Sequence, residues 1–265
     1  MEFDPHQGER WLDEVSIALP GLAGVLERSK ADVLVIGASV FHLFSRQGWI
    51  PALKRQTADL DLSVGIVHGR EDYEALRDGL LREGYRNEGL KYRYYSPRKL
   101  PGNLNYVDLL AHPIGRAVHP EQARNIMGAG PDFSFAGMEF AMLEAHSVTA
   151  RLHCPNPIGF IHLKRVAYLD DPMGRLKDLA DIVELGTGLV EKGSHFGIAP
   201  LWKKLSGSSE AQDVRKLFLE LGESRSSTWD LEDVRQELFK RGFTVQEIEE
   251  VIPERLLDLA RSMGA

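Results

Sequence analysis

The stretch "LKRQTADLDLSVGIV", residues 53–67, places two carboxylates inside an otherwise apolar segment. Side chains alternate along a strand, which puts Asp59 and Asp61 on one face and leucines on the other. Two neighbouring carboxylates that lose hydration also repel each other, so this pattern requires positive charge between them. A divalent, oxygen-seeking cation such as Mg²⁺ supplies that charge. The stretch therefore predicts a strand with a metal-binding face.

A third carboxylate follows in "NYVDLLAH", residues 105–112, which is also typical of a strand. Asp108 stands there between two apolar residues, so it points to the face opposite to theirs. If this strand lies beside the first, three carboxylates converge. Three carboxylates can hold two metal ions about 4 Å apart, which stabilises the attacking and the leaving oxygen in phosphoryl or nucleotidyl transfer. We therefore expect Asp59, Asp61 and Asp108 to be catalytic ligands of two Mg²⁺ ions.

A glycine turn precedes the two acids. The run "DVLVIGAS", residues 32–39, indicates a buried strand that ends at Gly37, and a helix follows with Ser39 as its expected N-cap. Backbone N–H groups at a glycine turn and at a helix start bind phosphate. Gly37 and Ser39 are therefore candidate nucleotide contacts.

The remaining pattern predicts an α/β (α+β) protein with a mixed-sheet core followed by a mostly helical C-terminal region. We expect a domain boundary near residue 155, giving a core of residues 1–155 and a helical domain of residues 156–265. The core is expected to contain helices over 8–29, broken at Pro20-Gly21, and over 70–85, ended by Gly84; a hairpin of 91–95 and 104–112; a loop over 116–135; and strands at 138–143 and 146–154.

Composition narrows the class of protein. The 265 residues are 43% hydrophobic and 27% charged, which is typical of globular chains, and the formal net charge is −7. An acidic balance argues against a broad nucleic-acid-coating surface, although it permits a local basic site. Cys154 is the only cysteine, which excludes an internal disulfide and a cysteine-based zinc cluster. With neither a leader-like N-terminus nor an apolar run long enough for a membrane span, we expect a cytoplasmic protein without a membrane partner.

The expected hairpin combines aromatic and basic residues. The segment "KYRYYSPRK" carries Lys91, Arg93, Arg98 and Lys99 among three tyrosines. Such interleaving can stack bases and contact phosphates. A hairpin with one solvated face explains the pattern equally well.

Taken in order, "VIGAS", "RQTADLDLSV" and "YVDLL" resemble the nucleotidyltransferase superfamily related to DNA polymerase β. The R-x-T-x-D-x-D form, which begins at Arg55, is similar to that of the AbiE-type toxin nucleotidyltransferases of type IV toxin-antitoxin systems. That branch also has a lysine on a helix followed by K-D-x-x-D, and "IHLKRVAYLDDPMGRLKDLADIVEL" supplies both. The resemblance covers about residues 33–186.

The resemblance implies roles for individual residues. Asp59 and Asp61 would bind metal, and Asp108 would accept the proton of the attacking hydroxyl. An NTP would be the substrate, and the end of an RNA such as tRNA, or a protein side chain, would be the acceptor. An antitoxin would be the protein partner. The nucleotide contacts would be Gly37, Ser39, Arg55, Thr57 and Lys164, and the supporting residues Arg175, Lys177, Asp178 and Asp181.

Some of these residues also have an alternative explanation in which they are only structural. Arg55 and Lys164 have solvated or ion-paired surface positions as alternatives, and Lys177 with Asp181 forms an i,i+4 pair of the kind that weakly stabilises helices. Ala38 stands where the superfamily usually has a second glycine, and its methyl group narrows the approach of phosphate to the backbone. Two further functions remain open: modification of a small molecule such as an aminoglycoside, and a degenerate protein that only binds nucleotide or a partner.

Overall fold

The computed structural model divides the chain into two compact units. Residues 3–47 and 56–155 form one, here called the sheet unit, and residues 1–2, 48–55 and 156–265 form the other, the helical unit. The structure describes residues 5–29, 32–51, 59–66, 70–90, 92–98, 104–113, 124–125, 138–145, 148–199, 202, 209–223 and 231–264.

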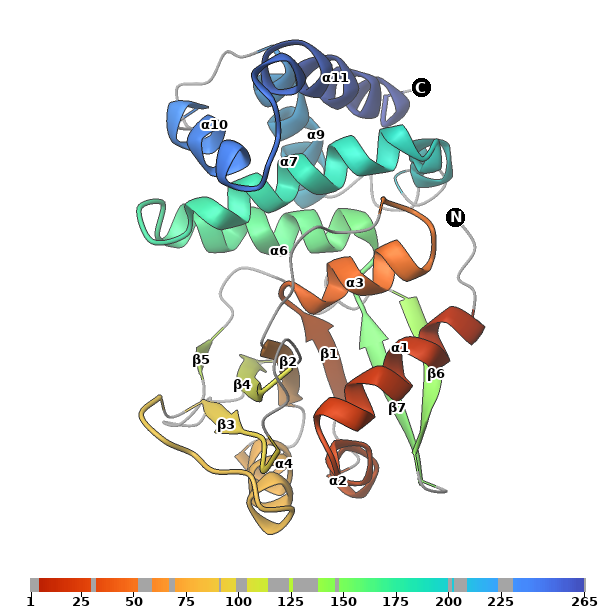
Figure 1. Cartoon of the computed structure of the whole chain (residues 1–265), viewed down its shortest axis with the longest axis vertical. Helices are drawn as coiled ribbons and strands as arrows, with labels where there is room; N and C mark the ends of the chain where they lie inside the picture. Colours follow the sequence, from red (N-terminus) through yellow and green to blue (C-terminus); the bar gives the residue numbers. More distant parts are fainter. Residues whose placement is uncertain are drawn as a thin grey trace. The chain divides into compact units, whose positions relative to one another are not determined.

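A mixed sheet organises the sheet unit (Figure 1). Its strand order is β3-β4-β2-β1-β7-β6, with the short β5 paired to β4. The pairs β1/β2, β3/β4 and β6/β7 are antiparallel, whereas β2/β4, β1/β7 and β4/β5 are parallel. The strands are β1 (Asp32–Ile36), β2 (Asp59–Ile66), β3 (Arg93–Tyr95), β4 (Tyr106–Pro113), β5 (Arg124–Asn125), β6 (Met138–Ala145) and β7 (Val148–Cys154).

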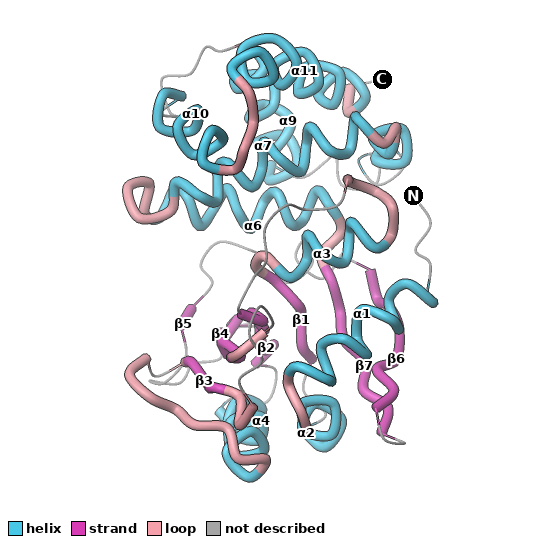
Figure 2. The backbone as a smooth tube through the Cα atoms, in the orientation of Figure 1, coloured by secondary structure: helices cyan, strands magenta, loops and turns pink. Residues whose placement is uncertain are grey.

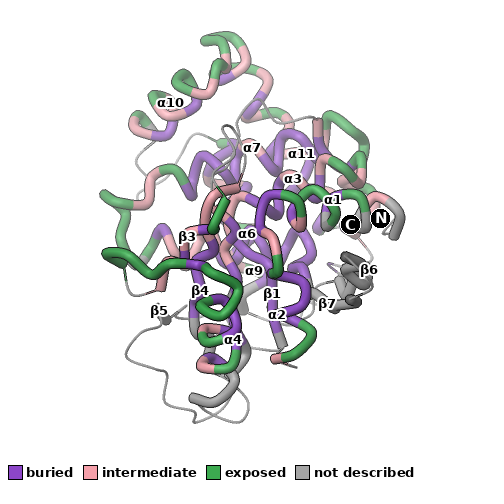
Figure 3. The backbone as a smooth tube through the Cα atoms, turned by 60° about the horizontal axis from the view of Figure 1, so that its bottom comes forward, coloured by how far each residue is buried: buried purple, intermediate pink, exposed green. Residues whose placement is uncertain are grey.

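Helices cover this sheet with apolar side chains. Helix α1 packs on β6, α2 on β7, α3 on β1 and β2, and α4 on β2. The continuous apolar run of β1 is buried from Val33 to Ile36, as expected for a central strand covered on both faces. Figure 3 shows this buried centre, and it shows the loop 86–90 as exposed. The helices are α1 (Pro5–Ala18), α2 (Leu22–Ser29), α3 (Ser39–Arg46) and α4 (Arg70–Arg82).

The described part of the helical unit carries helices and no strand (Figure 2). Asn156 fixes where the first helix begins, because its side chain accepts a hydrogen bond from the Gly159 N–H at 2.9 Å and a proline follows at the first helical position. Helix α7 contacts α6, α10 and α11, and α9 contacts α6 and α11. The elements are α6 (Pro157–Asp170), α7 (Leu176–Glu191), η1 (Ser194–Gly197), α9 (Ser209–Gly222), α10 (Leu231–Lys240), η2 (Glu247–Val251) and α11 (Ile252–Ser262).

The structure confirms the mixed α/β class, the interruption at Pro20-Gly21 and the hairpin of β3 and β4. Two local predictions were wrong. The expected loop over 116–135 contains β5, because residues 124–125 pair with the edge of β4. Ser39 does not cap α3, since Ala38 holds the N-cap position without a side-chain hydrogen bond. None of the helices in the described ranges combines the length and apolar character that a membrane crossing requires.

Candidate metal centre and the charges around it

Three carboxylates converge on one face of the sheet unit. Strands β2 and β4 lie side by side in parallel register, with Asp61 opposite Asp108 and Asp59 opposite Tyr106. Asp59, Asp61 and Asp108 each offer one carboxylate oxygen, and these three oxygens lie within 4.8 Å of one another. The expectation that the two strands adjoin, and so bring the acids together, is confirmed.

The opposite face of the same strands is apolar and closed. Leu60 and Leu62 of β2 are fully buried, as are Val107 and Leu109 of β4. Helix α4 contacts β2 on this side of the unit, where the hydroxyls of Tyr73 and Tyr94 lie 3.5 Å apart. Strand alternation therefore fixes the register, because a slip by one residue would bury the acids and expose the leucines.

The glycine turn at the end of β1 lies directly against one of the acids. Gly37 has a positive φ of 71°, which favours glycine. A Cβ atom at this position would overlap the carboxylate of Asp61. Ser39, which is buried, donates its hydroxyl proton to the backbone carbonyl of Asp59 at 2.9 Å. The glycine turn thus contacts Asp61, and the start of α3 contacts Asp59. The Ser39 hydroxyl makes this contact with Asp59 instead of capping the N-terminus of α3, as the sequence had predicted.

Gly37→Ala should cost about 2–3 kcal/mol of the free energy of unfolding of the sheet unit, because a positive φ strains an L residue and the new methyl group displaces Asp61. Chemical denaturation measures this loss, and a Mn²⁺ titration should show weaker binding. The matched control is Gly89→Ala, which has a φ of 79° and no atom within 4 Å of the added Cβ. The control should lose only about 1 kcal/mol; equal losses for the two variants would contradict the account.

A cation lies on the same face as the three acids. Arg93 of β3 stands opposite Asp108 in the antiparallel register. Its Nε donates to Asp108 Oδ1 at 2.8 Å and its Nη2 donates to Oδ2 at 2.7 Å. The guanidinium carbon also lies 3.8 Å from the centre of the Tyr106 ring. This pairing is bidentate and largely removed from water, since the Asp108 side chain is only 6% exposed and that of Arg93 21%.

Burial and neighbouring charges shift the pKa values of Asp108, Arg93 and Tyr106. Burial raises the pKa of the Asp108 carboxyl above its usual value, while the hydrogen bonds from Arg93 oppose that rise. The bonds to Asp108 raise the pKa of Arg93, so the guanidinium stays charged. Burial, reinforced by the nearby charge of Asp59, raises the pKa of Tyr106 to about 12. The phenol of Tyr106 is therefore neutral at physiological pH.

The donor set fits a hard divalent cation. Mg²⁺ binds oxygen at about 2.1 Å, so two oxygens on opposite sides of one ion lie about 4.2 Å apart. The three carboxylate oxygens lie within 4.8 Å of one another, which is slightly more than this separation. Asp59 and Asp61 are half-buried, whereas Asp108 is only 4% exposed. Asp59 and Asp61 are therefore the two more accessible acids of the three.

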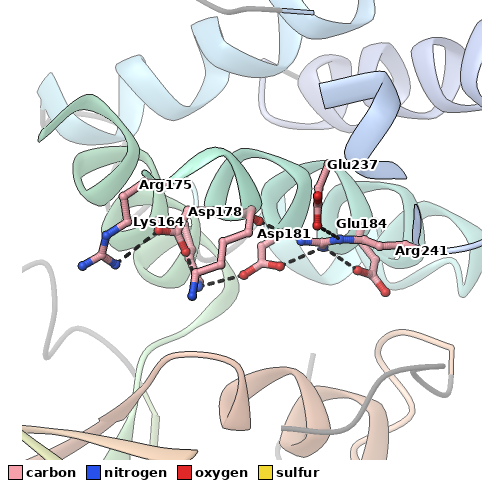
Figure 4. A network of polar contacts seen from close by, with 8 residues as sticks. Lys164, Arg175, Asp178, Asp181, Glu184, Glu237 and Arg241 are labelled. Carbon is pink, nitrogen blue, oxygen red and sulfur yellow. Dashed lines mark hydrogen bonds and ion pairs between the residues drawn. The ribbon is translucent and has the colours of Figure 1, made fainter. Parts of the chain in front are cut away.

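Lys164 belongs to a chain of buried ion pairs inside the helical unit (Figure 4). Its ammonium lies 2.6 Å from Asp178 Oδ1 and 2.7 Å from Asp181 Oδ2. Both carboxylate side chains are 2% exposed and that of Lys164 is 12% exposed. Burial lowers the pKa of Lys164, but the charges of Asp181 and Asp178 outweigh burial and raise it above its ordinary value. Lys164 is therefore a buried, charged cross-link between α6 and α7, not a solvated surface residue.

Arg241 extends this chain towards the end of α10. Its Nη1 lies 2.8 Å from Asp181 and 2.9 Å from Glu184, and its Nη2 donates to the Lys177 carbonyl at 2.9 Å. Asp181 thus pairs with Lys164 and Arg241 instead of the expected Lys177, whose side chain is exposed. The buried-charge cluster, as we call it, comprises Lys164, Arg175, Asp178, Asp181, Glu184, Glu237 and Arg241.

Arg175 reaches Asp178 at 3.4 Å, at the N-cap position of α7. The other two predicted nucleotide contacts, Arg55 and Thr57, lie outside the described residues. The sequence did not single out Arg93 as a partner of Asp108, and it did not point to Arg241. The alternation of Asp108 with the apolar residues on either side of it carried the signal for the face of the acids. The pairing of Arg93 with Asp108 depends on the strand register.

Comparison with known proteins gives no relative: no protein-family model matches the sequence, and no curated protein or solved structure matches it either.

Proposed function

We propose that the chain is a Mg²⁺-dependent nucleotidyltransferase of the DNA polymerase β type. It would move a nucleoside monophosphate from an NTP to a hydroxyl group and release pyrophosphate. One observation supports this most strongly: Asp59, Asp61 and Asp108 gather on adjoining parallel strands, with the turn at Gly37 packed against them. Carboxylates that can hold a divalent metal, next to a glycine turn whose N–H groups can bind phosphate, supply two elements that this chemistry uses.

Each residue has a distinct task in this proposal. Asp59 and Asp61 would hold the metal, which when bound supplies Lewis acidity to the phosphoryl oxygens. Asp108 would take the proton from the attacking hydroxyl. Backbone N–H groups of the turn at Gly37 would contact the triphosphate. Phosphate contacts by Ser39, Arg55, Thr57 and Lys164 remain predictions.

The acceptor is the second part of the proposal. An RNA end or a protein side chain follows from the toxin-like motif, and with it an antitoxin-like partner and a cytoplasmic location. The charge of the face favours a second candidate, since three carboxylates and one arginine attract a cationic small molecule such as an aminoglycoside. Arg93 is engaged by Asp108, so it adds little to a basic patch for RNA.

A labelling experiment tests the proposal and identifies the acceptor class together. The protein is incubated with each α-labelled NTP, Mg²⁺, total RNA, cell-extract protein and an aminoglycoside, and the three fractions are then separated. We expect label in one fraction with the wild type and none with Asp61→Asn. Label in no fraction, together with Mg²⁺-dependent NTP binding, would instead favour the degenerate, nucleotide-binding alternative.

A further inference from the structure

Three residues on the face of the acids form a row across neighbouring strands that the proposed function leaves unused. Tyr106 of β4 stands opposite Asp59 of β2, and Tyr95 of β3 stands opposite Tyr106. Arg86 continues the row beyond β3, because it forms an antiparallel bridge with Tyr95. Residues directly opposite each other on neighbouring strands point to the same face of a sheet. The row of Arg86, Tyr95 and Tyr106, here called the aromatic row, therefore leads outward from the acids over two rings to an arginine.

The two rings of the aromatic row are in contact and partly open to solvent. The centres of the Tyr95 and Tyr106 rings lie 5.5 Å apart, and the ring planes are tilted by 58°. Both tyrosines are half-buried, whereas Tyr94, which alternates with Tyr95 and points to the other face, is 1% exposed. Arg93 covers the Tyr106 ring, with its guanidinium carbon 3.8 Å from the ring centre. Tyr95, nearer the edge of the sheet, is therefore the ring better placed to stack on a planar ligand.

Arg86 supplies positive charge at the outer end of the aromatic row. Its side chain is 62% exposed, and it lies 3.5 Å from the equally exposed carboxylate of Glu88. An exposed pair of this kind is weak, so a phosphate group can compete for the guanidinium. A stacking ring beside an arginine is a combination by which proteins bind single-stranded nucleic acid. Arg86 would also repel a cationic small molecule from this part of the face.

The aromatic row and the glycine turn lie on opposite sides of the acids. The strand order β3-β4-β2-β1 places Tyr95 on one side of Asp59, and the turn at Gly37, which follows β1, on the other. The turn is the contact proposed above for the triphosphate, so the acceptor would approach from the side of Tyr95. Two strand spacings, about 10 Å, separate the backbones of Tyr95 and Asp59. This distance is about the length of three stacked nucleotides.

We propose that the aromatic row binds the single-stranded end of an RNA acceptor: Tyr95 stacks on one of the last three bases, and Arg86 contacts a phosphate. The inference rests on the proposed function and deepens it, because it selects RNA among the acceptors left open there. It also locates the acceptor on β3 and on the residue that pairs with its outer edge.

Binding of single-stranded RNA to the nucleotide-free, full-length protein tests this inference. The probe is a short RNA with a fluorescent label at its 5′ end, and fluorescence anisotropy measures its affinity. An RNA with an abasic residue at each of the last three positions in turn is the comparison. We expect one of these abasic RNAs to bind at least about tenfold more weakly than the intact RNA, because a stacked base contributes about 1.4 kcal/mol or more, which is a factor of ten.

Variants of the aromatic row assign this base dependence to a side chain. Tyr95→Leu should abolish the difference between intact and abasic RNA, and Tyr95→Phe, which keeps the ring, should retain it. Arg86→Gln should weaken the binding of every RNA by about threefold. Arg82→Gln is the matched control, because it removes the same charge from an exposed position on α4 and should leave RNA affinity unchanged.

The outcomes separate this inference from the proposed function. No RNA binding, or equal affinity of the wild type for intact and abasic RNA, would overturn the inference even if Tyr95→Leu failed to fold. A base dependence that persists in folded Tyr95→Leu would overturn it as well. Nucleotide label in the protein or small-molecule fraction would overturn the RNA acceptor and leave the proposed transfer standing. Base-dependent binding through Tyr95 without label in any fraction would support this site and overturn the proposed transfer.

Discussion

Asp61→Asn should lower the rate of nucleotidyl transfer by at least about 10³-fold. The substitution is isosteric, so it fits against Gly37, but it removes one of the two half-buried acids that would hold the metal. Metal ions contribute several kcal/mol of charge stabilisation to such transition states, and each 1.36 kcal/mol is worth a factor of ten in rate. Mn²⁺ affinity should fall in parallel, and initial rates with labelled NTP measure the loss of activity.

The stability of Asp61→Asn distinguishes a functional acid from a structural one. Removing a charge beside Asp59 relieves repulsion in the metal-free protein, so the free energy of unfolding should stay unchanged or rise. The matched control is Asp13→Asn on α1, an exposed acid, which should leave the rate and Mn²⁺ affinity unchanged. If Asp61→Asn unfolds while metal binding by its folded fraction is retained, the carboxylate is structural and the site is wrong.

Lys164→Met should destabilise the helical unit by about 3–5 kcal/mol. Lys164 neutralises Asp178 and Asp181, each 2% exposed, and removing one partner of a buried ion pair leaves charge uncompensated in a poorly hydrated place. Asp181 would retain its contact with Arg241 at 2.8 Å, whereas Asp178 would retain the longer contact of 3.4 Å with Arg175, so most of the loss falls on Asp178. Hydrogen exchange should therefore accelerate along α6 and α7, with α4 of the sheet unit as the internal reference.

The control for this variant is Lys177→Met, which removes the same charge from an exposed position on α7 and should change stability by less than about 0.5 kcal/mol. The result also decides between two roles of Lys164. A phosphate contact without a structural role predicts unchanged hydrogen exchange in Lys164→Met together with weaker NTP binding. That outcome would contradict the importance we assign to the buried-charge cluster.

Local patterns predicted most of the sheet unit. The sequence signals were the apolar run at Val33–Ile36, the alternation around Asp59 and Asp61, and the position of Asp108 between two apolar residues, and each is typical of a strand. They located the strands and the shared face of the acids. Local patterns do not determine strand register, because the pairing of distant segments depends on the packing of the whole sheet. The contact of Arg93 with Asp108 depends on that register and was therefore not predicted.

In the helical unit, too, local sequence patterns did not predict contacts between residues that are distant along the chain. The sequence pattern "KDLAD" suggested a surface ion pair of Lys177 and Asp181, since i,i+4 pairs are common on exposed helix faces. The neighbours that bury Asp181 come from α6 and from Arg241, 60 residues away along the chain, and no local pattern marks them. Asp181 therefore belongs to the buried-charge cluster and not to a weak surface pair, and we expect the removal of one partner from this cluster to be destabilising.

Anomalous diffraction from crystals grown with Mn²⁺ and a non-hydrolysable NTP analogue would locate the metal ion and the nucleotide. We expect a Mn²⁺ peak within about 2.2 Å of carboxylate oxygens of both Asp59 and Asp61, with the triphosphate beside the turn at Gly37. A bound analogue or Mn²⁺ ion elsewhere, with no peak between these two carboxylates, would contradict it.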